Sequence, residues 1–113
     1  IFPGFSWQNL SKTHNKSAEL GEIPRLKGQF LWSQAVACKK AGARMIYVAM
    51  FDEIDEGTAI FKCTNNPPVG ASSFLTYEGL PSDHYLWLTG RAGEMLRGQF
   101  PAEDAMPVPN RNR

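Results

Sequence analysis

The feature that most constrains the fold is a short apolar run, Met45–Phe51, that ends abruptly in four carboxylates within five residues. The run contains two β-branched residues and a tyrosine, a composition typical of a strand that is buried on both faces. Such strands belong to parallel sheets, whose ligands bind beyond the carboxyl ends of the strands. The sequence therefore predicts a functional site at the acids that follow the run: Asp52, Glu53, Asp55 and Glu56.

The segments on either side of this run complete an alternating pattern. Residues 1–7 resemble a strand that ends at Pro-Gly, and residues 28–41 and 82–98 have apolar side chains at helical spacing. Trp32 and Trp87 fall within these helices and are expected in the core. The order of strand, loop, helix, strand, acidic loop and helix predicts an α/β fold with a parallel sheet. A whole (β/α)₈ TIM barrel needs about 250 residues, more than twice the length of this chain. We therefore expect only part of such a barrel, its last two βα units.

Composition excludes several classes of protein. The chain has 113 residues, 42% of them hydrophobic, and a formal charge of +1, which is ordinary for one small globular domain. We expect that domain in residues 1–100 and a poorly ordered tail in residues 101–113, which contain three prolines. No basic cluster suggests nucleic acid, and no apolar run approaches the ~20 residues that span a membrane. Because the chain starts without Met and without a signal peptide, we expect a piece of a longer protein.

The cysteines and histidines do not indicate a catalytic centre. Cys38 and Cys63 permit one disulfide, but their spacing is not that of a metal site, and we expect free thiols. His14 lies in a polar loop and His84 follows a helix start. Without a paired serine or cysteine, neither histidine predicts a triad.

Glu53 and Glu56 are the best candidates for catalysis. Their spacing of three places both side chains on one face of a helical turn, with Cβ atoms roughly 5–6 Å apart. Two carboxyls so close repel each other when both are ionised, so one is expected to keep a proton. An acid beside a base is what cleavage of a glycosidic bond requires. A solvated acidic loop and a Ca²⁺ or Mg²⁺ site are the alternatives, although the spacing is not that of an EF-hand.

Four further residues are candidates for contact with a sugar. Asp52 and Asp55 can accept hydrogen bonds from hydroxyl groups, and Trp7 can stack on a sugar ring or pack internally. Arg25 can contact the substrate or form an ion pair with the acidic loop. The expected partner is therefore an oligosaccharide or polysaccharide.

The acidic stretch also carries a resemblance to a known family. Residues 51–58, Phe-Asp-Glu-Ile-Asp-Glu-Gly-Thr, resemble the Phe-Asn-Glu-Trp-His-Glu-Gly-Thr segment of glycoside hydrolase family 99, the endo-α-mannosidases and endo-α-mannanases. Residues 81–89 resemble the helix that follows there. Taken together with Phe2–Trp7 and Ile23–Arg25, residues 1–99 are most similar to bacterial proteins of the family 71/99-like group.

The resemblance implies a (β/α)₈ barrel with the rest of its strands upstream, a secreted or periplasmic location, no cofactor or metal, and retaining hydrolysis. By position, Glu53 would assist the sugar's 2-hydroxyl in its attack, and Glu56 would protonate the leaving oxygen and then activate water. Asp52 stands where the family has Asn, and Ile54-Asp55 stand where it has Trp-His. Mannose specificity is therefore not implied. We also expect residues 1–113 alone to lack turnover, because most of the cleft would come from the upstream strands.

Overall fold

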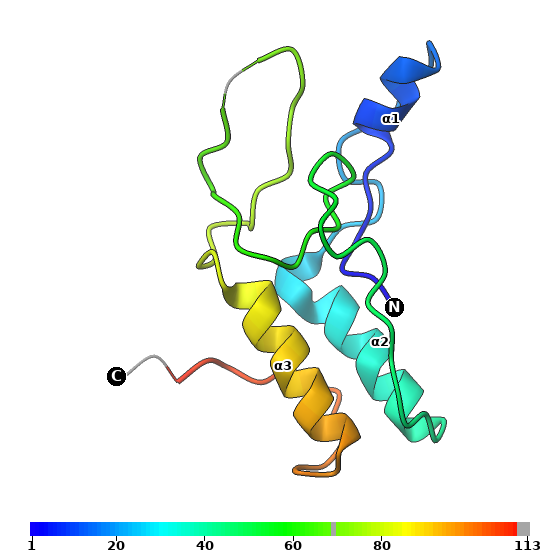
Figure 1. Cartoon of the computed structure of the whole chain (residues 1–113), viewed down its shortest axis with the longest axis vertical. Coiled ribbons are helices and arrows are strands. Elements are labelled where there is room, and N and C mark those ends of the chain that lie inside the picture. The colour runs from blue at the N-terminus through cyan, green and yellow to red at the C-terminus, as the bar shows by residue number, and fades with distance from the viewer. Residues whose placement is uncertain (69, 111–113) are drawn as a thin grey trace.

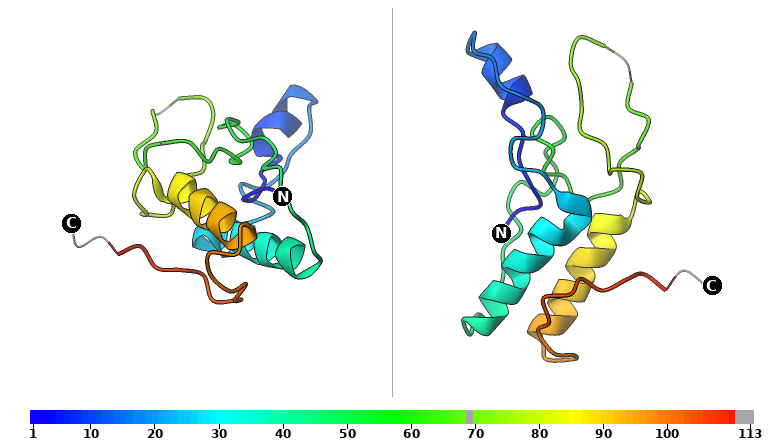
Figure 2. Two further views of the ribbon diagram at one scale, coloured as in Figure 1. Left: turned by 60° about the horizontal axis from the view of Figure 1, so that its bottom comes forward. Right: turned by 180° about the vertical axis from the view of Figure 1, so that it is seen from behind.

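A computed structural model describes residues 1–68 and 70–110. Its elements are α1 (Gln8–Thr13), the 3₁₀ turn η1 (Leu26–Gly28), α2 (Gln29–Lys40) and α3 (His84–Leu96). The two long helices lie side by side and run in the same direction (Figure 1). Together with residues 97–110, the two helices form what we call the helical base (Figure 1). A loop layer lies at the N-terminal ends of the helices and consists of residues 1–25 and 50–80, without Val69 (Figures 1 and 2). No described helix has both the length and the apolar character needed to cross a bilayer.

The expected α/β barrel portion is wrong, because the described residues form no sheet. Their only isolated bridge joins Phe5 and Ile23 in antiparallel fashion. In the segment that was expected to be a central strand, Met45–Val48 have no regular secondary structure, and Met50 then takes a left-handed φ of 55° within a turn. A strand needs a hydrogen-bonded neighbour along its length. Here the neighbour is Ile1 alone, whose ammonium donates to the Tyr47 carbonyl (2.8 Å) and whose carbonyl accepts from the Ala49 amide (2.9 Å).

The same segment is also not buried on both faces. Met45 and Tyr47 are 85% and 75% exposed, whereas Ile46 and Val48 pack against the helical core. This alternation is the period of a half-buried extended segment. The prediction of a strand buried on both faces is therefore wrong: the apolar run forms no strand, and one of its faces is open to solvent.

Both predicted helices are confirmed to within two residues at each end. α2 and α3 meet along buried apolar side chains, and the core that they share with the loop layer consists of Leu31, Trp32, Ala35, Val36, Ile60, Tyr77, Tyr85, Leu88, Ala92 and Met95. Gly28 lets the two helices approach at their N-terminal ends. It has a φ of 98°, and a Cβ there would lie 2.6 Å from Leu88 Cδ2, so both its conformation and its size favour glycine.

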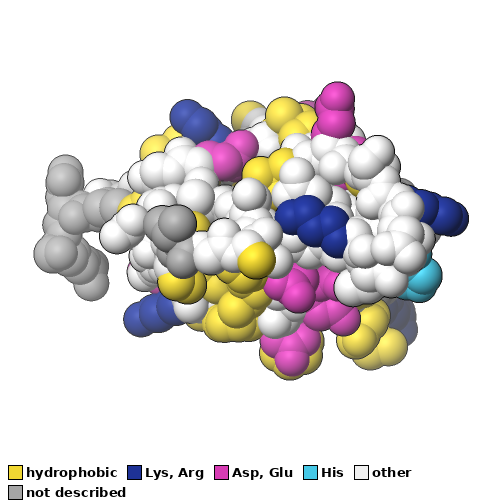
Figure 3. All heavy atoms as spheres, turned by 90° about the horizontal axis from the view of Figure 1, so that it is seen from above, with side chains coloured by type: hydrophobic (Ala, Val, Ile, Leu, Met, Phe, Trp, Pro, Cys, Tyr) yellow, Lys and Arg dark blue, Asp and Glu magenta, His cyan; other side chains and the backbone are white. Residues whose placement is uncertain are grey.

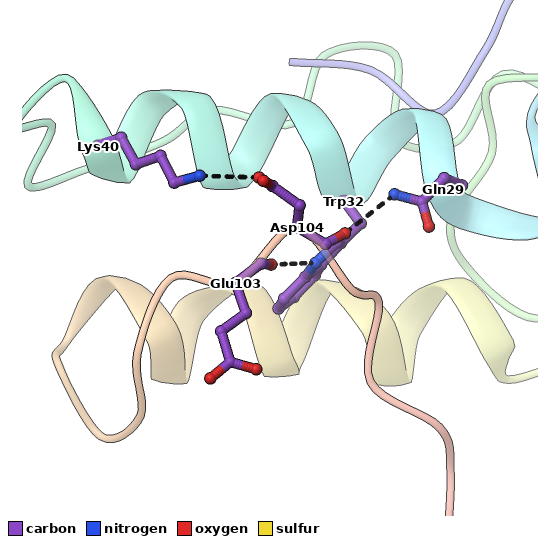
Figure 4. A network of polar contacts seen from close by, with 5 residues as sticks. All are labelled: Gln29, Trp32, Lys40, Glu103 and Asp104. Atoms are coloured by element: carbon purple, nitrogen blue, oxygen red, sulfur yellow. Dashed lines mark hydrogen bonds and ion pairs between the residues drawn. The ribbon is translucent and has the colours of Figure 1, made fainter.

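Residues 97–110 turn back from α3 and attach to α2 through polar contacts (Figure 4). The Trp32 indole donates to the Glu103 carbonyl (3.0 Å), Gln29 donates to the Asp104 carbonyl (3.3 Å), and Lys40 pairs with the Asp104 carboxylate (2.8 Å). Trp32 is 1% exposed, as expected of a core residue, and Trp87 packs against the core while half-buried. Residues 101–110 contain no helix or strand, and residues 111–113 of the predicted tail lie outside the described residues.

Candidate functional site

A cleft of about 690 Å³ lies in the loop layer and includes all four acids of the acidic loop, residues 52–56. This volume falls within the range of small-molecule sites, about 300–1,000 Å³. The opposite parts of the cleft are apolar or aromatic, with Phe61, Phe74 and Tyr77 among them. Figure 3 looks down on the loop layer and shows acidic side chains gathered at one place with hydrophobic side chains beside them. The cleft therefore combines carboxylates with apolar and aromatic side chains.

The acidic loop has a well-bonded backbone. The Glu53 carbonyl accepts hydrogen bonds from the Thr58 and Ala59 amides (3.0 and 2.9 Å) and from the Thr58 hydroxyl (3.2 Å). The same hydroxyl lies 2.6 Å from the Met50 carbonyl, and Thr58 is completely buried. These bonds close the loop on itself, so that the acids project from a turn whose shape is fixed by its own main chain.

The four acids differ in their exposure. Glu56 is half-buried, whereas Asp52, Glu53 and Asp55 are exposed. The two candidate catalytic residues thus occupy different environments within one cleft, and their roles remain predictions. Among residues 1–68 and 70–110, no three or more acidic, histidine or cysteine side chains converge in a manner suited to a metal ion.

The loop is joined to the N-terminal segment through its main chain. The Ser6 amide donates to the Glu56 carbonyl (2.8 Å), and the Asn9 amide group donates to the carbonyls of Ser73 (2.9 Å) and Asp55 (3.5 Å). Trp7 follows directly. It is 43% exposed, its ring lies 4.2 Å from that of Phe5, and it does not line the cleft. Trp7 is therefore near the backbone of Glu56 but on a surface separate from the cleft.

Arg25 contributes to the same cleft and is only 4% exposed. Its guanidinium carbon is 4.9 Å from the ring centroids of both Tyr77 and Tyr85, and its Nη1 donates to the Ala59 carbonyl (3.3 Å). An ion pair with the acidic loop, one of the two alternatives for Arg25, is not found among the described residues, whose ion pairs are Lys40–Asp104 and Arg91–Glu94.

Tyr77 and Tyr85 pack against Arg25, and neither was predicted from the sequence to be a functional residue. Tyr77 donates to the carbonyls of Ala59 (3.0 Å) and Phe61, and thereby secures the chain that leaves the acidic loop. Burial, with a smaller contribution from Cys63, raises the pKa of Tyr77 well above its ordinary value of 10. Burial likewise raises the pKa of Tyr85, while the Arg25 charge lowers it in part. No sequence signal pairs these tyrosines with an arginine more than fifty positions earlier in the chain.

Neither histidine lines the cleft. His84 is buried, with Nε2 2.9 Å from the Lys27 carbonyl, and His14 is exposed. Cys38 and Cys63 are both free, as expected, but they are half-buried and not fully buried, and Cys63 lines the cleft.

Comparison with known proteins adds no relative: no family model, no curated protein and no solved structure matches the chain.

Proposed function

We propose that this chain carries the acid pair of a glycoside hydrolase that cleaves an α-linked oligosaccharide or polysaccharide with retention of configuration. The observation that supports this most is the placement of Glu53 and Glu56 in one cleft with aromatic side chains. Sugars present both hydroxyl groups and apolar ring faces, so carboxylates and aromatic rings together suit them. The resemblance of residues 51–58 to the family 99 segment supports the same reaction.

We assign Glu53 and Glu56 the roles that the resemblance to family 99 implies. The Glu53 carboxylate would accept the proton of the 2-hydroxyl while that oxygen attacks the anomeric carbon. Glu56 would donate its proton to the departing glycosidic oxygen, so that the bond breaks without a free alkoxide. In the second step water would attack the anomeric carbon while the bond from that carbon to the 2-oxygen breaks. Glu56 would take a proton from the water, and Glu53 would return its proton to the released 2-oxygen. The half-buried Glu56 and the exposed Glu53 have the different surroundings that two different roles require.

Three other residues have places compatible with contact to the glycan. Asp52 and Asp55 line the cleft and are exposed, and Trp7 offers a partly exposed indole close to the Glu56 backbone. Contact with Trp7 would require a glycan that extends beyond the cleft, because Trp7 does not line it. On the resemblance alone, we also propose action in the periplasm or outside the cell, without a cofactor and without nucleic acid or membrane partners.

The decisive test compares Glu56→Gln and Glu53→Gln in the full polypeptide that the gene encodes around these residues. Aryl α-glycosides with a good and a poor leaving group serve as substrates. We expect each variant to lose 10²–10⁴-fold in rate on the poor leaving group. On the good leaving group, which needs no protonation, the first step of Glu56→Gln, measured as kcat/KM or as a burst of released aglycone, should be largely restored, while the second step stays slow because its base is missing. Neither step should be restored in Glu53→Gln.

Glu103→Gln provides the control, because Glu103 is an exposed acid outside the cleft. A loss of less than about tenfold in both cleft variants would contradict the catalytic roles. Saturable binding of the glycan without hydrolysis would instead favour the alternative class, a non-catalytic carbohydrate-binding or structural segment.

A further inference from the structure

The Arg25 guanidinium is a buried cation without an anionic partner among the described residues. It is 96% buried, since 4% is exposed, and its Nε has no hydrogen-bond partner there. Two tyrosine faces and one carbonyl are its known neighbours. A cation–π contact contributes about 0.5–2 kcal/mol, whereas the effective cost of burying an ion is several kcal/mol. The charge is therefore only partly compensated.

Because Arg25 lines the cleft, a ligand that binds there can supply a compensating group. Tyr77 and Tyr85 each lie 4.9 Å from its guanidinium carbon, and the side chain lines the cleft. Lys62, the other cation that lines the cleft, is exposed. Among the cationic side chains of the cleft, Arg25 is thus the one in a low-dielectric setting, where an anion would gain most.

Three of the four acids of the same cleft oppose an anion only weakly, whereas the half-buried Glu56 is screened less. Asp52, Glu53 and Asp55 are exposed, so water and salt screen their charges over a distance of about 8–10 Å. Carboxylate binding by arginine is moreover directional, because the planar guanidinium donates two parallel hydrogen bonds. An anionic group of a ligand can therefore reach Arg25 while the neutral sugar hydroxyls face the acids.

We propose that the cleft binds an acidic α-linked glycan, one whose uronic acid carboxylate is bound by Arg25. This inference rests on the proposed carbohydrate function and specifies its substrate class. Tyr77 and Tyr85 orient the guanidinium through their ring faces, and the Ala59 carbonyl fixes one of its nitrogens.

The experiment measures calorimetric affinity at about 0.15 M ionic strength, where the exposed acids are screened, for an α-1,4-linked pentamer of galacturonic acid and for its fully methyl-esterified form. The two differ in charge but share length and linkage. We expect wild-type protein to bind the acid form at least about tenfold more tightly, which corresponds to one hydrogen-bonded charge pair at about 1.4 kcal/mol per tenfold. Equal affinity for the two forms, or no binding of either, overturns the proposal.

Variants then locate the preference. Arg25→Gln should abolish it, and Arg25→Lys should retain only part, because lysine keeps the charge but not the planar fork. Lys62→Gln is the matched control, since it removes an exposed cation from the same cleft and should change the ratio by less than about twofold. A ratio that survives in folded Arg25→Gln and disappears in Lys62→Gln overturns the assignment to Arg25.

Because Arg25 is buried, a measurement on unaltered protein accompanies these variants. The Nε–H resonance of Arg25 in ¹⁵N-labelled protein should move on addition of the acid pentamer and stay unchanged with the ester. Acetate at the same carboxylate concentration should leave it unchanged; a shift with acetate alone would show a free-carboxylate site and overturn the glycan assignment. Glu56→Gln should keep the acid preference while it loses hydrolysis, so failure of the catalytic proposal and failure of this one are distinguishable.

Discussion

The helical base and the loop layer show two ways of ordering a chain of this size. In the base, α2 and α3 bury apolar side chains against each other along their length, and their backbone groups bond within each helix. In the loop layer, order comes from individual contacts, such as the Thr58 hydroxyl between two carbonyls and Arg25 between two tyrosines. The base is therefore stabilised by many non-directional apolar contacts, and the loop layer by a few directional polar contacts.

The largest expected effect is in the base. Leu88→Ala removes a completely buried side chain at the contact of α3 with Gly28, and we expect a loss of about 2–5 kcal/mol in the free energy of unfolding. Leu86→Ala in the same helix is the control, because Leu86 is 42% exposed and should cost less than about 0.5 kcal/mol. Urea denaturation followed by circular dichroism measures both. Similar losses for the two leucines would show that the base is loosely packed.

The tyrosines at the junction of the two regions give the next largest effect, and it depends on pH. Burial raises the pKa of Tyr77 and Tyr85 above the ordinary value of 10, so the unfolded chain loses these protons first. The stability that the neutral tyrosines contribute is fully present below pH 10 and is lost as pH rises through the folded-state values. Each tyrosine with a raised pKa should lower the free energy of unfolding by about 1.4 kcal/mol for every pH unit above 10.

Urea midpoints between pH 8 and 11, with phenolate absorbance as a second signal, test this dependence. Tyr85→Phe should flatten the alkaline decline by removing one of the two contributions. Tyr47→Phe is the control, because Tyr47 is 75% exposed. An unchanged slope in Tyr85→Phe would mean that Tyr85 is accessible to solvent in the folded protein.

These regions also differ in how much of them the sequence could predict. The two long helices were predicted because their apolar spacing is a local property that tertiary contacts reinforce. The strand over residues 45–51 was wrong because an apolar run does not reveal whether a neighbouring strand exists to bond with it. The position of the acidic loop was foreseeable from its composition. The pairing of Arg25 with Tyr77 and Tyr85 was not, because it depends on how the chain folds across the loop layer.

A smaller effect should appear in the loop layer alone. Thr58→Val keeps the shape of the side chain but leaves the Met50 carbonyl without its hydroxyl donor, and we expect a loss of about 1–2 kcal/mol. Thr58→Ser retains the hydroxyl and should recover most of that loss. Hydrogen exchange of the Thr58 and Ala59 amides, which bond the Glu53 carbonyl, should accelerate in the valine variant while the amides of α2 stay protected. Equal acceleration in α2 would show that base and loop layer unfold as one unit.

The smallest expected effect concerns the polar attachment of residues 97–110 to the base. The Lys40 and Asp104 side chains are 53% and 85% exposed, so water competes for both charges. A double-mutant cycle with Lys40→Gln and Asp104→Asn should give a coupling energy of about 0.2–1 kcal/mol, and it should fall further at 1 M salt. The Asp104 carbonyl keeps its bond from Gln29 in every variant, as the Glu103 carbonyl keeps its bond from Trp32 (Figure 4). A coupling well above 1 kcal/mol would mean that this ion pair, and not the buried Trp32 contact, holds the segment against α2.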